Sequence, residues 1–308
     1  MNIIGISEGF HDAALTVLVD SKIIFASHSE RYSRIKGDKW IHPDMWPKTQ
    51  RYQPDVVAYY EKPFLKNTRR LYAGQKWQKP RVKYDTSFSH HESHAAAGFY
   101  TSSFDECNVL VVDAIGEWDT VSIWEGKDDK LTKIKSWKYP YSLGLLYSAI
   151  TQRIGLKPNE DEYITMGMSA FGAPSYDLEP LLWENNHRGV VDVWKGASDF
   201  DLAASVQALY EKKFLELVDM CPHENLIIMG GCALNCLANS KIEGKNIWIM
   251  PSPGDAGSSL GAAALVRKKK LQWRNPYTGY PIFNGMPVKK VVDELEKNRV
   301  CGIANGKA

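Results

Sequence analysis

Two histidines, His90 and His94, have a spacing that could support metal chemistry. They lie four positions apart in the segment SHHESHAAAGFY, whose alanine-rich continuation favours a helix. Residues four apart share one face of a helix, so both imidazoles could reach a single metal ion. The pattern is not HExxH, so it does not indicate a zinc protease. A polar helix start with hydrogen-bonded histidines is the alternative reading.

Two aspartates extend this pair to four candidate ligands. Asp113 ends NVLVVD, a strand predicted to be buried, and open α/β sheets bind ligands at the carboxyl ends of such strands. Asp255 follows a second apolar strand, NIWIM, and begins a helix, where it could serve only as a cap. Two nitrogen and two oxygen ligands suit iron, manganese or zinc, and the residues do not choose among them.

Glycine-rich turns follow four predicted strands, in GISEGFHDAA, DAIGEW, MGGCALN and SPGDAGSSLG. Glycines at strand ends let the backbone approach a ligand, and free N–H groups there can hold phosphates. Four such turns indicate a nucleotide cleft, although no Walker A or dinucleotide fingerprint is present. In ERYSRIKGDK, the side chains of Arg31, Arg34 and Lys36 could hold an anion or could form a solvated charged face.

The elements that would position these residues repeat along the chain. Three short strands within 2–27 form one predicted meander, and NVLVVD, TVSIWEG and KLTKIKSW form a second. Helical segments follow each meander, including 142–155 and the long amphipathic stretch 198–220. We therefore predict an internal structural duplication.

Length and composition set further bounds. The 308 residues are enough for two packed lobes or one large α/β domain. The chain has 38 basic and 36 acidic side chains, which leave a formal net charge of +2. This balance does not favour a broad surface for binding nucleic acid or membranes. We find no apolar run of about 18 residues and no secretory leader, so we expect a cytoplasmic protein without a membrane span. The five irregularly spaced cysteines fit a reducing compartment.

Taken together, the motifs resemble the O-carbamoyltransferase family of nodulation-factor and antibiotic biosynthesis. The resemblance covers most of the chain and rests on eight motifs in the family's order: GISEGFHDAA, SERYSRIKGD, SHHESHAAAGFY, VLVVDAIGEWDT, YSLGLLYSAIT, EYITMGMSAFG, GGCALNCLAN and PSPGDAGSSLGAA. It implies the duplicated actin-like ATPase fold of sugar kinases and heat-shock proteins, an α/β fold with two lobes. We expect the first lobe at 1–107, the second at 108–270 and a connecting segment at 271–308.

The resemblance also implies an activity. In this family a YrdC-like domain converts carbamoyl phosphate and ATP into carbamoyl-adenylate. The domain that resembles this chain then passes the carbamoyl group to a hydroxyl of a small molecule, sugar or modified nucleotide. Members of the family usually continue into the YrdC-like domain, so we expect this chain to need one, in cis or in trans.

The family's functional residues carry over onto matching positions here. Its divalent-metal ligands fall on His90, His94, Asp113 and Asp255. Its nucleotide-facing residues fall on Lys36, Gly116, Glu117, Gly230, Gly231 and Asn235. The catalytic candidates are His11 and Asp12, one of which would take the proton from the hydroxyl.

Two other functions stay open. An actin-like nucleotide-binding module without transfer activity would not require the pair formed by His90 and His94. Threonylcarbamoyl transfer to tRNA would favour a basic face, which a net charge of +2 supports poorly. The acceptor, the metal and the oligomeric state, a homo-oligomer included, are not encoded in any motif that we find.

Overall fold

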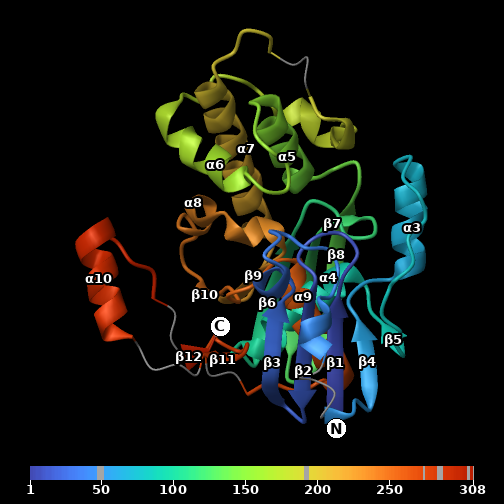
Figure 1. Ribbon diagram of the computed structural model, residues 1–308. Helices are drawn as coiled ribbons and strands as arrows, with labels where there is room; N and C mark the ends of the chain where they lie inside the picture. Colours follow the sequence, from blue (N-terminus) through green and yellow to red (C-terminus); the bar gives the residue numbers. More distant parts are fainter. Residues whose placement is uncertain (47–51, 191–193, 273–274, 283–286, 304–305, 308) are drawn as a thin grey trace.

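The structure is a computed structural model that describes residues 1–308 except 47–51, 191–193, 273–274, 283–286, 304–305 and 308. Two five-stranded mixed sheets form its centre (Figure 1). The first has the order β3-β2-β1-β4-β5, from β1 (Asn2–Ser7), β2 (Ala14–Val19), β3 (Lys22–His28), β4 (Val56–Tyr59) and β5 (Thr86–Ser87). The first three strands are antiparallel neighbours, whereas β4 and β5 extend the sheet in parallel.

The second sheet repeats this topology. Its order is β10-β9-β6-β7-β8, from β6 (Glu106–Val112), β7 (Asp119–Lys127), β8 (Lys130–Lys138), β9 (Asn225–Met229) and β10 (Asn246–Trp248). Strands β6, β7 and β8 are antiparallel, and β9 and β10 are added in parallel beside β6. The matching orders and directions confirm the predicted duplication and the actin-like fold class. The predicted lobe limits stay a prediction.

Two helices, α4 (His90–Thr101) and α9 (Asp255–Arg267), lie between the sheets. Helix α9 packs on β1, β2 and β4, and α4 packs on β6 and β9, so the helix pair joins the two sheets (Figure 1). The helices meet closely because Gly261 has no side chain: a Cβ there would lie 1.7 Å from the backbone oxygen of Ser93. This contact sets the distance between two helices that carry candidate ligands.

A helical cap covers the other face of the second sheet. It contains α5 (Leu143–Arg153), α6 (Glu162–Met168) and α7 (Asp199–Asp219), at the top of Figure 1. Leu110 and Val112 of β6 share a buried core with Leu146, Ile150 and Phe214 of the cap. Strand β6 buries every residue except Glu106 because helices cover both of its faces.

The other elements lie at the periphery. They are the helices α1 (Glu30–Ser33), α3 (Pro63–Tyr72), α8 (Cys236–Asn239) and α10 (Val288–Asn298), the two-residue strands β11 (Pro281–Ile282) and β12 (Gly306–Lys307), and short 3-10 turns. Helix α3 occupies the first half of the basic, aromatic segment 63–82, for which the sequence predicts only a surface excursion. Among the residues that the structure describes, no helix has both the length and the apolar character needed to cross a membrane.

Candidate metal and nucleotide site

Four side chains converge where β6 ends beside α4 and α9. His90 and His94 lie on the first two turns of α4, Asp113 follows β6, and Asp255 begins α9. All four are buried, and one ligand atom from each lies within 4.8 Å of the other three. His90 Nε2 is 2.9 Å from Asp113 Oδ2 and 3.0 Å from His94 Nε2. Asp255 Oδ1 lies 3.4 Å from each of these imidazole nitrogens.

The first turn of α4 determines where the two imidazoles point. A capping box fixes the start of this helix: the Ser89 side chain accepts a hydrogen bond from the backbone N–H of Glu92, whose carboxylate accepts one from the backbone N–H of Ser89. Positions 90 and 94 then share a helix face. His91 points elsewhere, with Nδ1 2.8 Å from Ser122 Oγ. The structure therefore brings together the four predicted ligands and leaves out the third histidine.

The two carboxylates favour positive charge in the cluster. Burial lowers the pKa of His90, but the charge of Asp255 and the hydrogen bond to Asp113 outweigh it and hold the pKa well above the ordinary value. Burial raises the pKa of Asp113 and of Asp255, but interaction with His90 outweighs it and holds both pKa values below the ordinary range. Without a cation, a proton on His90 partly offsets the two carboxylates.

These residues fit a divalent cation. Distances between their facing nitrogen and oxygen atoms run from 2.9 to 3.8 Å. Ligands held about 2.0–2.2 Å from one ion are separated by roughly 3–3.6 Å, so small adjustments suffice. Two neutral imidazoles and two carboxylates carry two negative charges, which a divalent ion neutralises. Ser258 Oγ, 3.1 Å from His94 Nδ1, supports the ring from behind.

Two residues predicted to face the nucleotide lie behind His90. Glu117 is buried, and its carboxylate accepts hydrogen bonds from the backbone N–H groups of His90, at 3.0 Å, and Lys62, at 2.8 Å. Gly116 lies against the His90 ring. Both therefore position α4 and its first histidine, and their predicted contact with a nucleotide stays a prediction.

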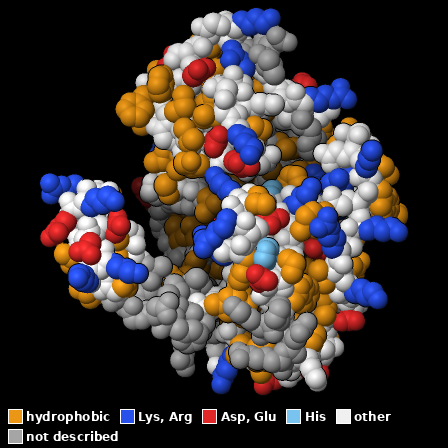
Figure 2. Space-filling view, in the orientation of Figure 1, with side chains coloured by type: hydrophobic (Ala, Val, Ile, Leu, Met, Phe, Trp, Pro, Cys, Tyr) orange, Lys and Arg blue, Asp and Glu red, His pale blue; other side chains and the backbone are white. Residues whose placement is uncertain are grey.

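A cavity of about 280 Å³ opens beside the cluster, between the sheets and the cap. Asp113 and Asp255 line its inner end, and Gly231 and Asn235 line its wall. The space-filling view shows basic, histidine and hydrophobic side chains close together where the cap meets the sheets (Figure 2). Gly230, which precedes Gly231, must be a glycine for the chain to turn after β9. Its φ is +91°, and a Cβ there would lie 2.2 Å from Val112 O.

Of the remaining predicted residues, His11 and Asp12 reach this cavity, whereas Lys36 is not among its lining residues. His11 and Asp12 line it, with His11 Nδ1 2.7 Å from Asp12 Oδ2. Lys36 is exposed, and its Nζ lies 5.4 Å from the ring centre of Tyr163, a cavity residue on α6. Burial lowers the pKa of His11, but the charge of Asp255 and the hydrogen bond to Asp12 outweigh it and raise the pKa to about 9.

This shift predicts a pH dependence of stability in protein stripped of metal. The folded-state pKa of His11, about 9, lies above the unfolded value of 6.5. The protonated ring therefore stabilises the fold fully below pH 6.5, and the contribution is lost as the pH rises through about 9. We expect the melting temperature of the wild type to fall more than that of His11→Asn between these pH values. An equal fall in melting temperature for the two proteins over this pH range, measured with a chelator present, would contradict this.

Sequence reasoning missed two parts of the site. Tyr147 of α5 and Tyr210 of α7 line the cavity with Cys232, which follows β9, and only the packing of the cap on the second sheet brings them together. Glu61 follows β4 and lies 3.9 Å from His90 Nδ1. A signal for Glu61 was present, because it ends the apolar run PDVVAYY as Asp113 ends NVLVV.

Comparisons with solved structures agree on the fold. The chain superposes on the Acidaminococcus fermentans (R)-2-hydroxyglutaryl-CoA dehydratase component A with a TM-score of 0.55, 15% identity, and coverage of 87% of this chain and 98% of that chain. A full-length HypF in a phosphate- and nucleotide-bound form matches with a TM-score of 0.50 and 15% identity over 87% of this chain and 46% of HypF. At such identities the likeness concerns the fold alone, the duplicated actin-like ATPase fold.

Sequence relatives share more. Protein sll1178 of Synechocystis sp., described as uncharacterised, is 32% identical over 88% of this chain and 58% of its own length. Nodulation protein NolNO of Sinorhizobium fredii is 26% identical over 83% of this chain and 46% of its own length. The chain thus spans about half the length of these relatives. The family described as carbamoyltransferase N-terminus matches residues 52–190 and 182–264, so this chain belongs to the carbamoyltransferase family.

Proposed function

We propose that this chain performs the transfer step of an ATP-dependent O-carbamoyltransferase. In that step the carbamoyl group of carbamoyl-adenylate passes to a hydroxyl. The observation that carries the proposal is the buried cluster His90, His94, Asp113 and Asp255, two of whose carboxylates line a cavity of about 280 Å³ in a carbamoyltransferase-family chain. The similarity of this chain to nodulation proteins, and its fold likeness to a nucleotide-bound HypF, support the same proposal.

The four ligands would hold iron, manganese or zinc. When bound, such an ion supplies electrostatic stabilisation of the negative charge that develops on the carbamoyl oxygen or the phosphate. The residues of the chain bind and orient the adenylate. Gly231 and Asn235 shape the cavity wall, and hydrogen bonds to Gln207 hold the Asn235 amide in place. The apolar wall near Tyr147 and Tyr210 excludes water.

His11 is the proposed base. Its Nδ1 is paired with Asp12, so Nε2 of the neutral ring is the nitrogen left to accept a proton. Once the charge of Asp255 is neutralised, a main cause of the raised pKa of His11 is removed, and the ring can be neutral. The acceptor oxygen then attacks the carbamoyl carbon, and its proton passes to His11 Nε2. The bond from that carbon to the phosphate oxygen breaks, and AMP leaves.

Carbamoyl-adenylate itself would come from a YrdC-like domain acting on carbamoyl phosphate and ATP. We propose that this domain acts in cis or in trans, and that the acceptor is a hydroxyl-bearing small molecule, sugar or modified nucleotide.

Product analysis tests the proposal. The chain is incubated with carbamoyl-adenylate, or with an active YrdC-like partner, carbamoyl phosphate and ATP, and with a panel of hydroxyl compounds. We expect metal-dependent release of AMP that one acceptor class stimulates at least 10-fold, since a correctly bound nucleophile supplies more than this. Release of ADP, or no AMP with an active partner, would favour a nucleotide-binding module. Stimulation by tRNA with a threonylcarbamoyl donor alone would favour tRNA modification.

A further inference from the structure

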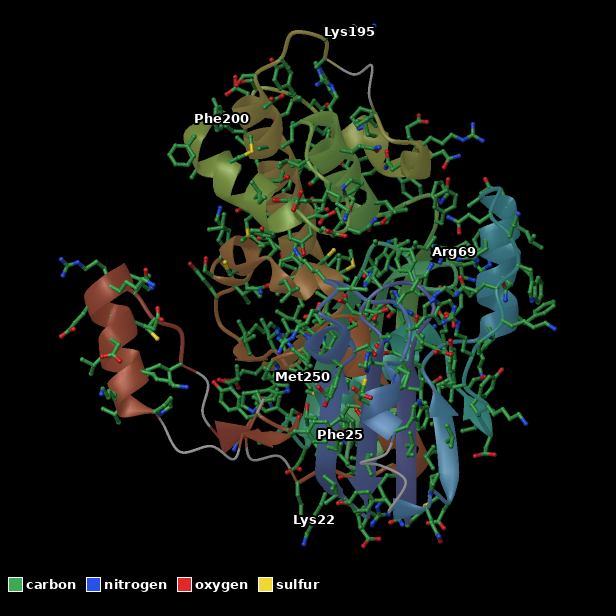
Figure 3. All side chains as sticks on the ribbon, viewed as in Figure 1. Lys22, Phe25, Arg69, Lys195, Phe200 and Met250 are labelled. Atoms are coloured by element: carbon green, nitrogen blue, oxygen red, sulfur yellow. The ribbon has the colours of Figure 1, made fainter. Side chains whose placement is uncertain are left out.

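A buried ion pair lies directly behind His90. Glu61, 3% exposed, follows β4, and its Oε2 accepts a hydrogen bond from Lys66 Nζ at 2.8 Å. Lys66 lies on α3, is 6% exposed, and also donates to Tyr60 OH at 3.2 Å. Arg69, one turn further along α3, lies on the side of the helix that faces the sheets (Figure 3). Helix α3 therefore turns charged side chains towards the site.

The nitrogen of His90 that faces away from the ligand cluster has no hydrogen-bond partner. His90 Nδ1 is buried and unpaired, and Glu61 Oε2 lies 3.9 Å away. When His90 Nε2 binds a cation, the neutral ring must carry its proton on Nδ1. A buried N–H without an acceptor costs about 1–3 kcal/mol. Glu61 Oε2 would need to move about 1 Å to accept that proton at normal hydrogen-bond length.

We propose that Glu61, anchored by Lys66, is a positioning residue that accepts the Nδ1–H of His90 and so fixes its tautomer and strengthens Nε2 as a metal ligand. This inference rests on the proposed metal site. Lys66 holds the carboxylate in place, because its charge compensates that of the buried Glu61 at 2.8 Å. The second histidine has a different partner, the neutral hydroxyl of Ser258.

Metal-affinity measurements test the inference. Dissociation constants for Zn²⁺ and Mn²⁺ are measured by chelator competition for the wild type, Glu61→Gln and Glu61→Ala. Loss of the partner of a metal-binding histidine weakens affinity about 10- to 100-fold. We expect metal affinity to fall about 10-fold in Glu61→Gln, which keeps a hydrogen-bond acceptor but loses the charge, and about 100-fold in Glu61→Ala.

A matched control is available in the second sheet. Asp119 Oδ2 also accepts from a lysine, Lys133, at 2.8 Å, but it does not contact the histidines, so Asp119→Asn should bind metal as the wild type does. If Glu61→Ala fails to fold, the double variant Glu61→Gln with Lys66→Met removes the pair without leaving an unpaired buried charge. It should lose affinity about as much as Glu61→Gln, about 10-fold.

A spectroscopic readout separates positioning from general destabilisation. In Zn²⁺-loaded protein with ¹⁵N-labelled histidine, the Nδ1 resonance of His90 should shift in Glu61→Ala and stay in place in Asp119→Asn. Folded Glu61 variants that bind metal within twofold of the wild type with an unchanged His90 resonance would overturn the inference while leaving the metal site standing. A wild type that binds no metal would overturn both.

Discussion

Replacing His94 with Ala should abolish metal loading and carbamoyl transfer. His94 Nε2 lies 3.0 Å from His90 Nε2 and 3.4 Å from Asp255 Oδ1, so its loss leaves three ligands and a void. We expect metal affinity to fall at least about 100-fold, and AMP release by at least about 1,000-fold, because both binding and charge stabilisation are lost. Metal content by mass spectrometry and AMP release measure the two effects.

The neighbouring histidine provides the control for this variant. His91 lies on the same helix and is equally buried, but its ring hydrogen-bonds to Ser122 and not to the four ligands. His91→Gln should therefore retain metal, provided that thermal melts show it folded. Full metal occupancy and activity in His94→Ala would contradict the assignment of the ligands.

Replacing Gly261 with Ala should strongly destabilise the fold. Its Cβ would lie 1.7 Å from the backbone oxygen of Ser93, and neither backbone can move without separating α9 from α4. We expect a loss of about 3 kcal/mol or more in the free energy of unfolding, because overpacking against backbone is poorly relieved. The separation would also move Asp255 away from His90 and weaken metal binding.

A second helical glycine isolates the cause. Gly167 lies on α6 with no atom within 4 Å of an added Cβ. Gly167→Ala should be neutral or stabilising by up to about 1 kcal/mol, as expected from helix propensity. Denaturant unfolding measures both variants. A Gly261→Ala protein as stable as the wild type would show that the two helices are not packed as described.

Much of this architecture could be predicted because its signals are local. The apolar runs of β1, β6 and β9 identify buried strands, and the repeated meander identifies the duplication. The spacing of His90 and His94 fixes a shared helix face whatever the tertiary structure. Asp113 was predictable because it follows the buried strand β6 at the edge where ligands bind. The strand before Asp255, β10, is short and largely exposed, so the turn that follows it was the better signal for that residue.

The rest depends on packing between distant segments. Nothing near Glu117 in the sequence reveals that its carboxylate accepts from the backbone of His90 rather than facing the cavity. The helix α3 was missed because Lys66 and Asn67 face inward while Phe64 and Leu65 are exposed, which reverses the usual amphipathic pattern. Glu61 ends an apolar run, but only the approach of His90 on α4 reveals what lies beside its carboxylate.

An anomalous-difference map from crystals grown with Mn²⁺, Fe²⁺ or Zn²⁺ shows directly whether the four side chains hold a metal ion. We expect one strong peak between His90 Nε2, His94 Nε2 and the carboxylates of Asp113 and Asp255, at about 2.0–2.3 Å from each ligand atom. A peak elsewhere, or none at this cluster in crystals that retain the ion, would contradict the account of the site.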